Sequence, residues 1–234
     1  MSRIHSAVLV LTLAAATPLA FAGDHDGDKS GNPSGIDKVN GSIDAEAGQT
    51  YGNLDTVNGS IRIATGAHTG SAETVNGSIK VADDAHSGGL TTVNGSIHLD
   101  ARVQVDGGIE TVNGGIFVDR GGRVSKGVAT VNGAIGLVDT DLEGGIDTVN
   151  GDITVGVGSH VKGGIKVKKP GASWFPISFG KHQPPRIIIG PNAVVDGPLV
   201  FERAVKLYVH SSAHIGSVSG ATAVRYNGDR PPQE

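Results

Sequence analysis

Apolar residues recur at fixed positions around an Asn-Gly pair that appears seven times in the first two thirds of the chain. The intervals between successive asparagines of these pairs are 18, 18, 18, 19, 19 and 18 residues. Valine stands one residue before every asparagine and isoleucine three residues after it. A repeat this short and regular is typical of a solenoid, in which equivalent segments of successive coils stack on one another. The asparagines are Asn40, Asn58, Asn76, Asn94, Asn113, Asn132 and Asn150.

The apolar positions within one coil indicate β-strands. A second apolar residue follows the isoleucine two positions later, and another lies four positions before the asparagine. An apolar residue at every second position is the pattern of a half-buried strand. Most coils read Thr-Val-Asn, and the sequence leaves open whether the threonine or the valine faces the interior.

The Asn-Gly pair predicts a tight corner, because glycine adopts positive φ without steric cost. In isolation the pair would favour a hairpin, but the short period favours strands that pair with their equivalents one coil away. Stacked asparagines would then hydrogen-bond along the axis as a ladder. We therefore predict an all-β fold, a single-stranded β-solenoid (parallel β-helix) of about ten coils with an 18–19-residue period.

Changes in the pattern divide the chain. The N-terminus is typical of a secretory signal peptide, with Arg3 before an apolar segment and a small-x-small cleavage site at Ala20–Ala22. The apolar segment is too short to span a bilayer, so we expect no transmembrane segment after cleavage. The predicted parts are a signal peptide (1–22), a flexible leader (23–35), regular coils (36–169), an aromatic and proline-containing loop (170–186), degenerate coils (187–221) and a flexible tail (222–234).

Composition and charge narrow the function classes. The chain contains no cysteine, so an exported form would depend on packing instead of disulfides. Residues 23–160 carry 19 acids and 8 bases, whereas residues 161–234 carry 4 acids and 10 bases. The net charge of −4 makes nucleic acid an unexpected partner for an exported chain. Oppositely charged ends instead predict head-to-tail self-association, which salt should weaken.

The Thr-Val-Asn-Gly-Ser-Ile coils, from about Ile36 to Val167, resemble bacterial adhesin domains of unknown function that are related to auto-transporter-adhesin head domains. The resemblance implies an exported, non-catalytic β-solenoid, adhesin-like or structural, in the periplasm or at the cell surface. The segment from Ile187 to Gly220 more weakly resembles bactofilin coils, although those scaffolds are cytoplasmic. Neither resemblance supplies catalytic residues.

Acidic residues form one candidate metal site. They stand three positions before most of the asparagines, where carboxylates one coil apart would repel each other and a divalent cation would relieve the repulsion. A solvated row, interrupted by Thr91 and Ala129, is the interpretation we favour. The acids of this row are Asp37, Asp55, Glu73, Glu110 and Asp147.

A calcium loop is a second candidate, because residues 26–37 match several of its ligand positions. Asp37 replaces the bidentate glutamate, however, and no helix can flank the segment, so we predict a polar leader.

Two pairs of histidines have a spacing that could suggest a metal site, but the strand pattern around them argues against both. His68 and His86 are one coil apart, and we expect Val105 and Val124 to continue their column, which favours a corner position. His210 and His214 have the spacing of a helical metal-binding pair, but they stand in a strand pattern, where such residues do not converge. We therefore predict no metal and no cofactor.

Enzyme motifs are absent from the sequence. It contains no nucleophile elbow, metalloprotease motif, phosphate loop or dinucleotide fingerprint. Solenoid acyltransferases need a cytoplasmic coenzyme, and solenoid polysaccharide lyases build clefts from much larger coils. We predict a protein that is not an enzyme.

Lysines near the end of the regular coils support an alternative function. Lysines that alternate along a strand share one face, which suits a polyanion, and an aromatic loop would supply an anchor. The alternative is a binding module for an anionic envelope polysaccharide. For the residues themselves we favour a solvated face and a loop that shields a strand edge. The candidate ligand-binding residues are Lys162, Lys166, Lys168, Lys169, Trp174 and Phe175.

Overall fold

The computed structural model describes residues 33–170, 183–228 and 230–232. Every regular element in these ranges is a β-strand, and they contain no helix that could cross a membrane. The predicted signal peptide, the calcium-loop match up to residue 32, and Trp174 and Phe175 lie outside the described residues.

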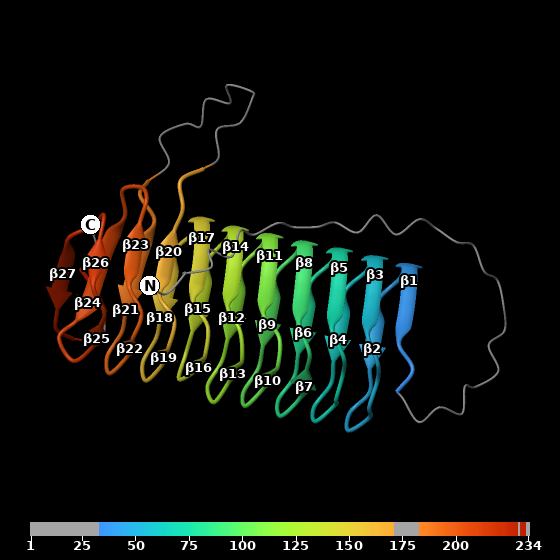
Figure 1. Ribbon diagram of the computed structural model, residues 1–234. Helices are drawn as coiled ribbons and strands as arrows, with labels where there is room; N and C mark the ends of the chain where they lie inside the picture. Colours follow the sequence, from blue (N-terminus) through green and yellow to red (C-terminus); the bar gives the residue numbers. More distant parts are fainter. Residues whose placement is uncertain (1–32, 171–182, 229, 233–234) are drawn as a thin grey trace, which may run out of the picture. The chain divides into compact units, whose positions relative to one another are not determined.

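The strands form three parallel sheets in which neighbouring strands come from successive coils (Figure 1). Sheet A contains β1 (Ile36–Asn40), β3 (Leu54–Asn58), β5 (Ala72–Asn76), β8 (Leu90–Asn94), β11 (Ile109–Asn113), β14 (Val128–Asn132), β17 (Ile146–Asn150), β20 (Ile165–Val167), β23 (Leu199–Phe201) and β26 (Val218–Ser219). Sheet B contains β2 (Ile43–Ala45), β4 (Ile61–Ile63), β6 (Ile79–Val81), β9 (Ile97–Leu99), β12 (Ile116–Val118), β15 (Ile135–Leu137), β18 (Ile153–Val155), β21 (Arg186–Ile189), β24 (Lys206–His210) and β27 (Ala223–Tyr226). Sheet C contains β7 (His86–Ser87), β10 (Gln104–Val105), β13 (Arg123–Val124), β16 (Asp141–Leu142), β19 (His160–Val161), β22 (Val194–Val195) and β25 (His214–Ile215).

Strand pairing follows the repeat. In sheet A, Asn113 lies opposite Asn94 and Asn132, and Ile109 lies opposite Leu90 and Val128. All pairs are parallel, and the two longer sheets have ten strands each. The predicted β-solenoid fold is therefore confirmed.

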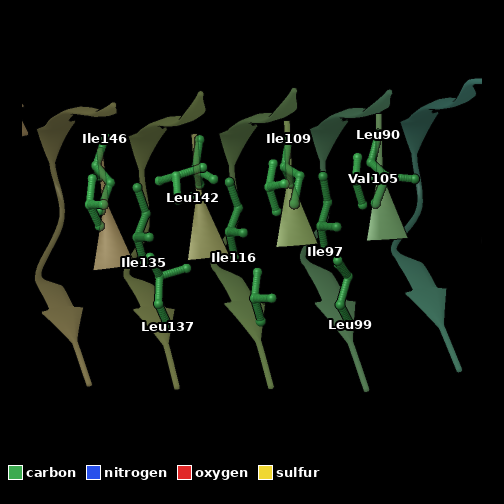
Figure 2. Packing of buried hydrophobic residues seen from close by; sticks show 14 of the residues in the cluster. Leu90, Ile97, Leu99, Val105, Ile109, Ile116, Ile135, Leu137, Leu142 and Ile146 are labelled. Carbon is green, nitrogen blue, oxygen red and sulfur yellow. The ribbon is translucent and has the colours of Figure 1, made fainter. Parts of the chain in front are cut away.

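The interior is filled by one apolar layer from each sheet. Figure 2 shows Ile109 of sheet A, Ile116 of sheet B and Val105 of sheet C among the side chains that point inward. Each of these three side chains is at most 1% exposed. Because equivalent residues stack from coil to coil, every interior coil shares its buried surface with two neighbours.

Threonine, not valine, faces this interior in sheet A. Thr92 is 1% exposed, whereas Val39 and Val57 on the outer face are 64% and 42% exposed. The Thr92 hydroxyl donates to the carbonyl oxygen of Gly77 in the preceding coil at 2.8 Å. This bond removes the cost of burying a hydroxyl, so the alternation of the strand continues to the corner.

At the Asn-Gly corners after the first coil, packing between coils requires the glycine. Gly41 has a φ of 111°, but Gly59, Gly77, Gly95, Gly114 and Gly151 do not have positive φ. A Cβ on any of these five would instead collide with the carbonyl group of the glycine one coil earlier. The explanation from positive φ is therefore wrong for most of the coils.

Two segments depart from the regular coil. Residues 168–185 separate β20 from β21 in the sequence, and β21 is in register with the preceding coil, with Ile187 opposite Ile153. The predicted tail (222–234) includes β27, so the prediction placed the end of the solenoid too early. Tyr226 explains the extra strand, because it is 6% exposed and its ring packs edge-on against His210 at 5.1 Å.

Candidate functional site

The corner asparagines form one hydrogen-bonded row. Each Nδ2 donates to Oδ1 of the asparagine in the preceding coil at 2.9 to 3.0 Å. At the last asparagine, Oδ1 of Asn150 accepts from Arg203, whose guanidinium also donates to the Val149 carbonyl oxygen at 3.0 Å. The side-chain amides therefore hydrogen-bond to one another along the row. Arg203 donates to the last side-chain carbonyl oxygen, that of Asn150, which no further asparagine reaches. Sequence analysis missed Arg203, because no pattern links it to an asparagine 53 residues earlier.

The acidic residues lie on the outer face of sheet A. Asp55 of β3 lies between Asp37 of β1 and Glu73 of β5. Partial burial, together with the charges of Glu73 and Asp37, raises the pKa of Asp55 to about 6. Further along, Glu110 lies opposite Thr91 and Ala129, which separates it from the next acids. The described ranges contain no group of three metal-ligating side chains arranged to hold an ion.

The candidate lysines lie next to acids from other coils. Lys162 Nζ lies 2.6 Å from Glu143 Oε1, Lys166 Nζ 3.0 Å from Glu202 Oε1, and Lys168 Nζ 3.4 Å from Asp147 Oδ2.

The backbone N–H of Lys169 donates to Glu202 Oε2 at 3.2 Å. Lys166 lies on β20 of sheet A, whereas Lys162 follows β19 of sheet C. The structure therefore places these lysines in a mixed-charge region. Exposed pairs of this kind contribute about 0–1 kcal/mol each.

The histidine column differs from the predicted one. His86 pairs with His68 and with Gln104, whereas Val105 pairs with Ser87. The prediction that Val105 and Val124 continue the column is therefore wrong. The coil from Asn94 to Asn113 has 19 residues, and its extra residue lies between Val105 and Ile109. The spacing of the asparagines shows that one residue is added but not where in the coil it lies.

The histidines of sheet C face outward. The rings of His68 and His86 meet edge to face at 5.5 Å, and His86 Nε2 lies 2.9 Å from Asp106 Oδ2. His210 and His214 lie in different sheets, on β24 and β25.

Sheet B carries an outward row that sequence analysis did not single out. It begins with charged residues and becomes aromatic and apolar toward the C-terminal coils. The His98 and Phe117 rings stack at 5.0 Å with an interplanar angle of 16°, and the Phe117 ring lies beside Gly136. The register places in this row Asp44, Arg62, Lys80, His98, Phe117, Gly136, Thr154, Ile188, Tyr208 and Val224.

A hollow of about 320 Å³ lies at the C-terminal part of this row. It is lined by Gln183, Arg186, Lys206, Tyr208 and Pro232. The guanidinium carbon of Arg186 lies 5.5 Å from the centroid of the Tyr208 ring. The hollow therefore combines two cations, an aromatic ring and an amide.

A second hollow, of about 360 Å³, lies at the other end of the coils. It is lined by Pro33, Thr50, Tyr51, Gly52, His68, Thr69 and Gly70.

Comparison of the chain with protein-family models, with curated proteins and with solved structures finds no match. The resemblance to adhesin domains, and the weaker one to bactofilins, therefore stay predictions.

Proposed function

We propose that this chain is an exported, non-catalytic β-solenoid of the bacterial cell envelope that acts as an adhesin-like or structural scaffold. The observation that carries the proposal is the repetition of the outer face of sheet A. Seven consecutive coils present a valine and an asparagine at the same two positions, about 4.8 Å apart. A surface with this regularity suits an extended or repetitive partner better than a small molecule, which proteins usually enclose in a pocket.

The use of charged side chains supports a structural role. Arg62 pairs with Asp44 at 2.7 Å, and Arg102 pairs with Asp84 at 2.6 Å, in each case across one coil boundary. Such exposed pairs add little stability, and they use these charged side chains for contacts between neighbouring coils.

Export is tested by expressing the complete chain with its own N-terminus in a bacterium. We expect a product that begins at Gly23 in the periplasmic or surface fraction, identified by intact mass. A variant with Ala20→Arg and Ala22→Arg should retain residues 1–22. A wild-type chain that stays uncleaved in the cytoplasm would refute the proposal.

Scaffolding by head-to-tail contact is tested by sedimentation at low and high salt. The excess of acids before residue 161 and of bases after it should drive assembly that depends on concentration and is reversed by salt. A monomer under all conditions would refute this mechanism of assembly.

The alternative proposal is a polysaccharide site formed by the Lys162–Trp174 region. A polyanion bound there would have to replace the carboxylates that lie beside Lys162, Lys166 and Lys168. Replacing Lys166 and Trp174 by alanine should abolish binding of an anionic polysaccharide without unfolding the coils. Undiminished binding would reject this site.

A further inference from the structure

We propose that the hollow over β21 and β24 binds an acidic sugar residue of a carboxylated polysaccharide, whose chain continues along the outer row of sheet B to Phe117. The inference rests on the proposed function for the source of the polysaccharide, the cell envelope. The proposed site lies on sheet B, whereas Lys166 lies on sheet A and Lys168 directly follows the same strand. The hollow supplies recognition of the acid group, and the row supplies contact with the following sugars.

Arg186 carries the recognition. Arg62, Arg102 and Arg123 each lie within 4.0 Å of an aspartate. In the described ranges, by contrast, no carboxylate forms an ion pair with the Arg186 guanidinium. Asp152 accepts a hydrogen bond from the Arg186 backbone N–H at 2.8 Å. Among the described residues, therefore, Asp152 contacts the Arg186 backbone but no carboxylate is paired with the guanidinium.

Tyr208 holds the Arg186 guanidinium in place. The ring lies 5.5 Å from the guanidinium carbon and is 5% exposed. A guanidinium above an aromatic face is stabilised electrostatically and keeps its N–H groups available at its edge. This planar arrangement of donors matches a carboxylate, which it binds through two parallel hydrogen bonds.

Lys206 adds charge at the same place. It lies directly opposite Arg186 in the parallel pair of β21 and β24. Lys206 has other interactions in the structure, and its charge adds to the positive potential of the hollow. Gln183 and Pro232 also line the hollow, which adds a polar and an apolar residue for contact with the rest of a sugar.

The outer row extends the site beyond the hollow. Ile188, Thr154, Gly136 and Phe117 follow Tyr208 in register, one coil at a time, and none of them is charged. The four steps from Tyr208 to Phe117 span roughly 19 Å. The coil spacing is close to the length of one sugar in an extended polysaccharide. The Phe117 ring, supported by His98, presents an apolar surface at the far end of the row.

The position of the row favours a polysaccharide over a peptide. An extended peptide usually binds by adding a strand to a free sheet edge. The row lies on the face of β12, β15, β18, β21 and β24, each of which already has a strand on both sides. Their backbone groups are therefore used, and recognition must come from side chains. Hydroxyl and carboxylate groups on a flat, repeating chain fit this surface.

The test measures binding of galacturonic acid oligomers to the purified full-length chain by calorimetry. The probes are the dimer, the hexamer, a hexamer with its carboxylates reduced to alcohols, and inorganic phosphate. We expect the acidic hexamer to bind, Arg186→Gln to weaken it at least tenfold, and Phe117→Ala to weaken the hexamer but not the dimer. Arg62→Gln, which changes a paired arginine of the same row, should leave affinity unchanged. Circular dichroism verifies that each variant is folded.

Several results would overturn the inference. These are no binding of the acidic hexamer, equal binding of the reduced hexamer, or equal effects of Arg186→Gln and Arg62→Gln. Displacement of the hexamer by equimolar phosphate would assign the hollow to phosphate groups and overturn the carboxylate assignment. An exported chain that fails to bind the hexamer refutes this inference alone. A chain that binds the hexamer but stays in the cytoplasm refutes only the proposed function.

Discussion

Replacing Gly114 by alanine should destabilise the solenoid far more than replacing Gly115, the next residue of the same corner. A Cβ on Gly114 would overlap the carbonyl oxygen of Gly95 and lie 2.5 Å from its carbonyl carbon. These are backbone atoms, so the clash can be relieved only by separating two coils. A Cβ on Gly115 would have its nearest neighbour, the Ala134 carbonyl oxygen, at 3.2 Å.

The expected magnitude follows from the bonds around the clash. Overpacking costs about 1–3 kcal/mol. Separation of these two coils also weakens two backbone hydrogen bonds between them, from Gly95 N to Asn113 O (3.2 Å) and from Ile97 N to Gly115 O (2.9 Å). At about 1 kcal/mol for each bond, Gly114→Ala should lower the free energy of unfolding by roughly 3–5 kcal/mol. Gly115→Ala should change it by less than about 1 kcal/mol, because a Cβ there also reduces the entropy of the unfolded chain.

Urea denaturation followed by circular dichroism measures both variants beside the wild type. Repeat proteins can unfold in several steps, so hydrogen exchange of the amides in β8, β11 and β14 provides a second readout. We expect a large shift of the midpoint and faster exchange for Gly114→Ala only. Equal midpoints for the two variants would refute the packing explanation of the corner glycines.

Three further predictions concern the outer rows. The folded-state pKa of Asp55 is raised to about 6, so its contribution favours folding at low pH and is lost as pH rises through 6. Because this side chain is partly solvated, its own contribution to stability should rise by only about 1 kcal/mol between pH 7 and pH 4, and the difference between wild type and Asp55→Asn in denaturation measured across that range should show it. Arg203→Ala should cost about 1–3 kcal/mol, because it leaves the carbonyl end of the asparagine row without its charged donor; an unchanged urea midpoint would contradict this role. Asn94→Ala breaks two side-chain bonds and Asn40→Ala one, so thermal melting should show a larger loss for Asn94→Ala, and the reverse order would contradict the ladder account.

The periodic part of the molecule could be predicted from the sequence because each coil repeats the same packing problem. Isoleucine and valine columns fix the strands, and the Asn-Gly pair fixes the corner. Alternation alone could not decide between Thr92 and Val93, since a bend beside the asparagine would have allowed either to face inward. The hydroxyl bond to Gly77, which settles the choice, depends on the distance between coils.

The non-periodic features could not be predicted in the same way. The prediction placed Val105 opposite His86, but Gln104 lies there. The error arose because the spacing of the asparagines shows which coil has an extra residue but not its position in that coil. The pairing of Arg186 with Lys206 could not be predicted from the repeat, because residues 168–185 interrupt the period before Arg186. The candidate ligand-binding residues chosen from sequence, Lys162 to Phe175, are close together in the chain, whereas those of sheet B are brought together only by the register.

The most direct test of the proposed envelope role is co-sedimentation of the chain with envelopes isolated from cells that produce it. Wild-type protein and folded Gly115→Ala should pellet with the envelopes, and Gly114→Ala, in which the coils are separated, should remain largely in solution. Wild-type protein that stays in the supernatant, or pelleting that does not depend on an intact solenoid, would contradict the account.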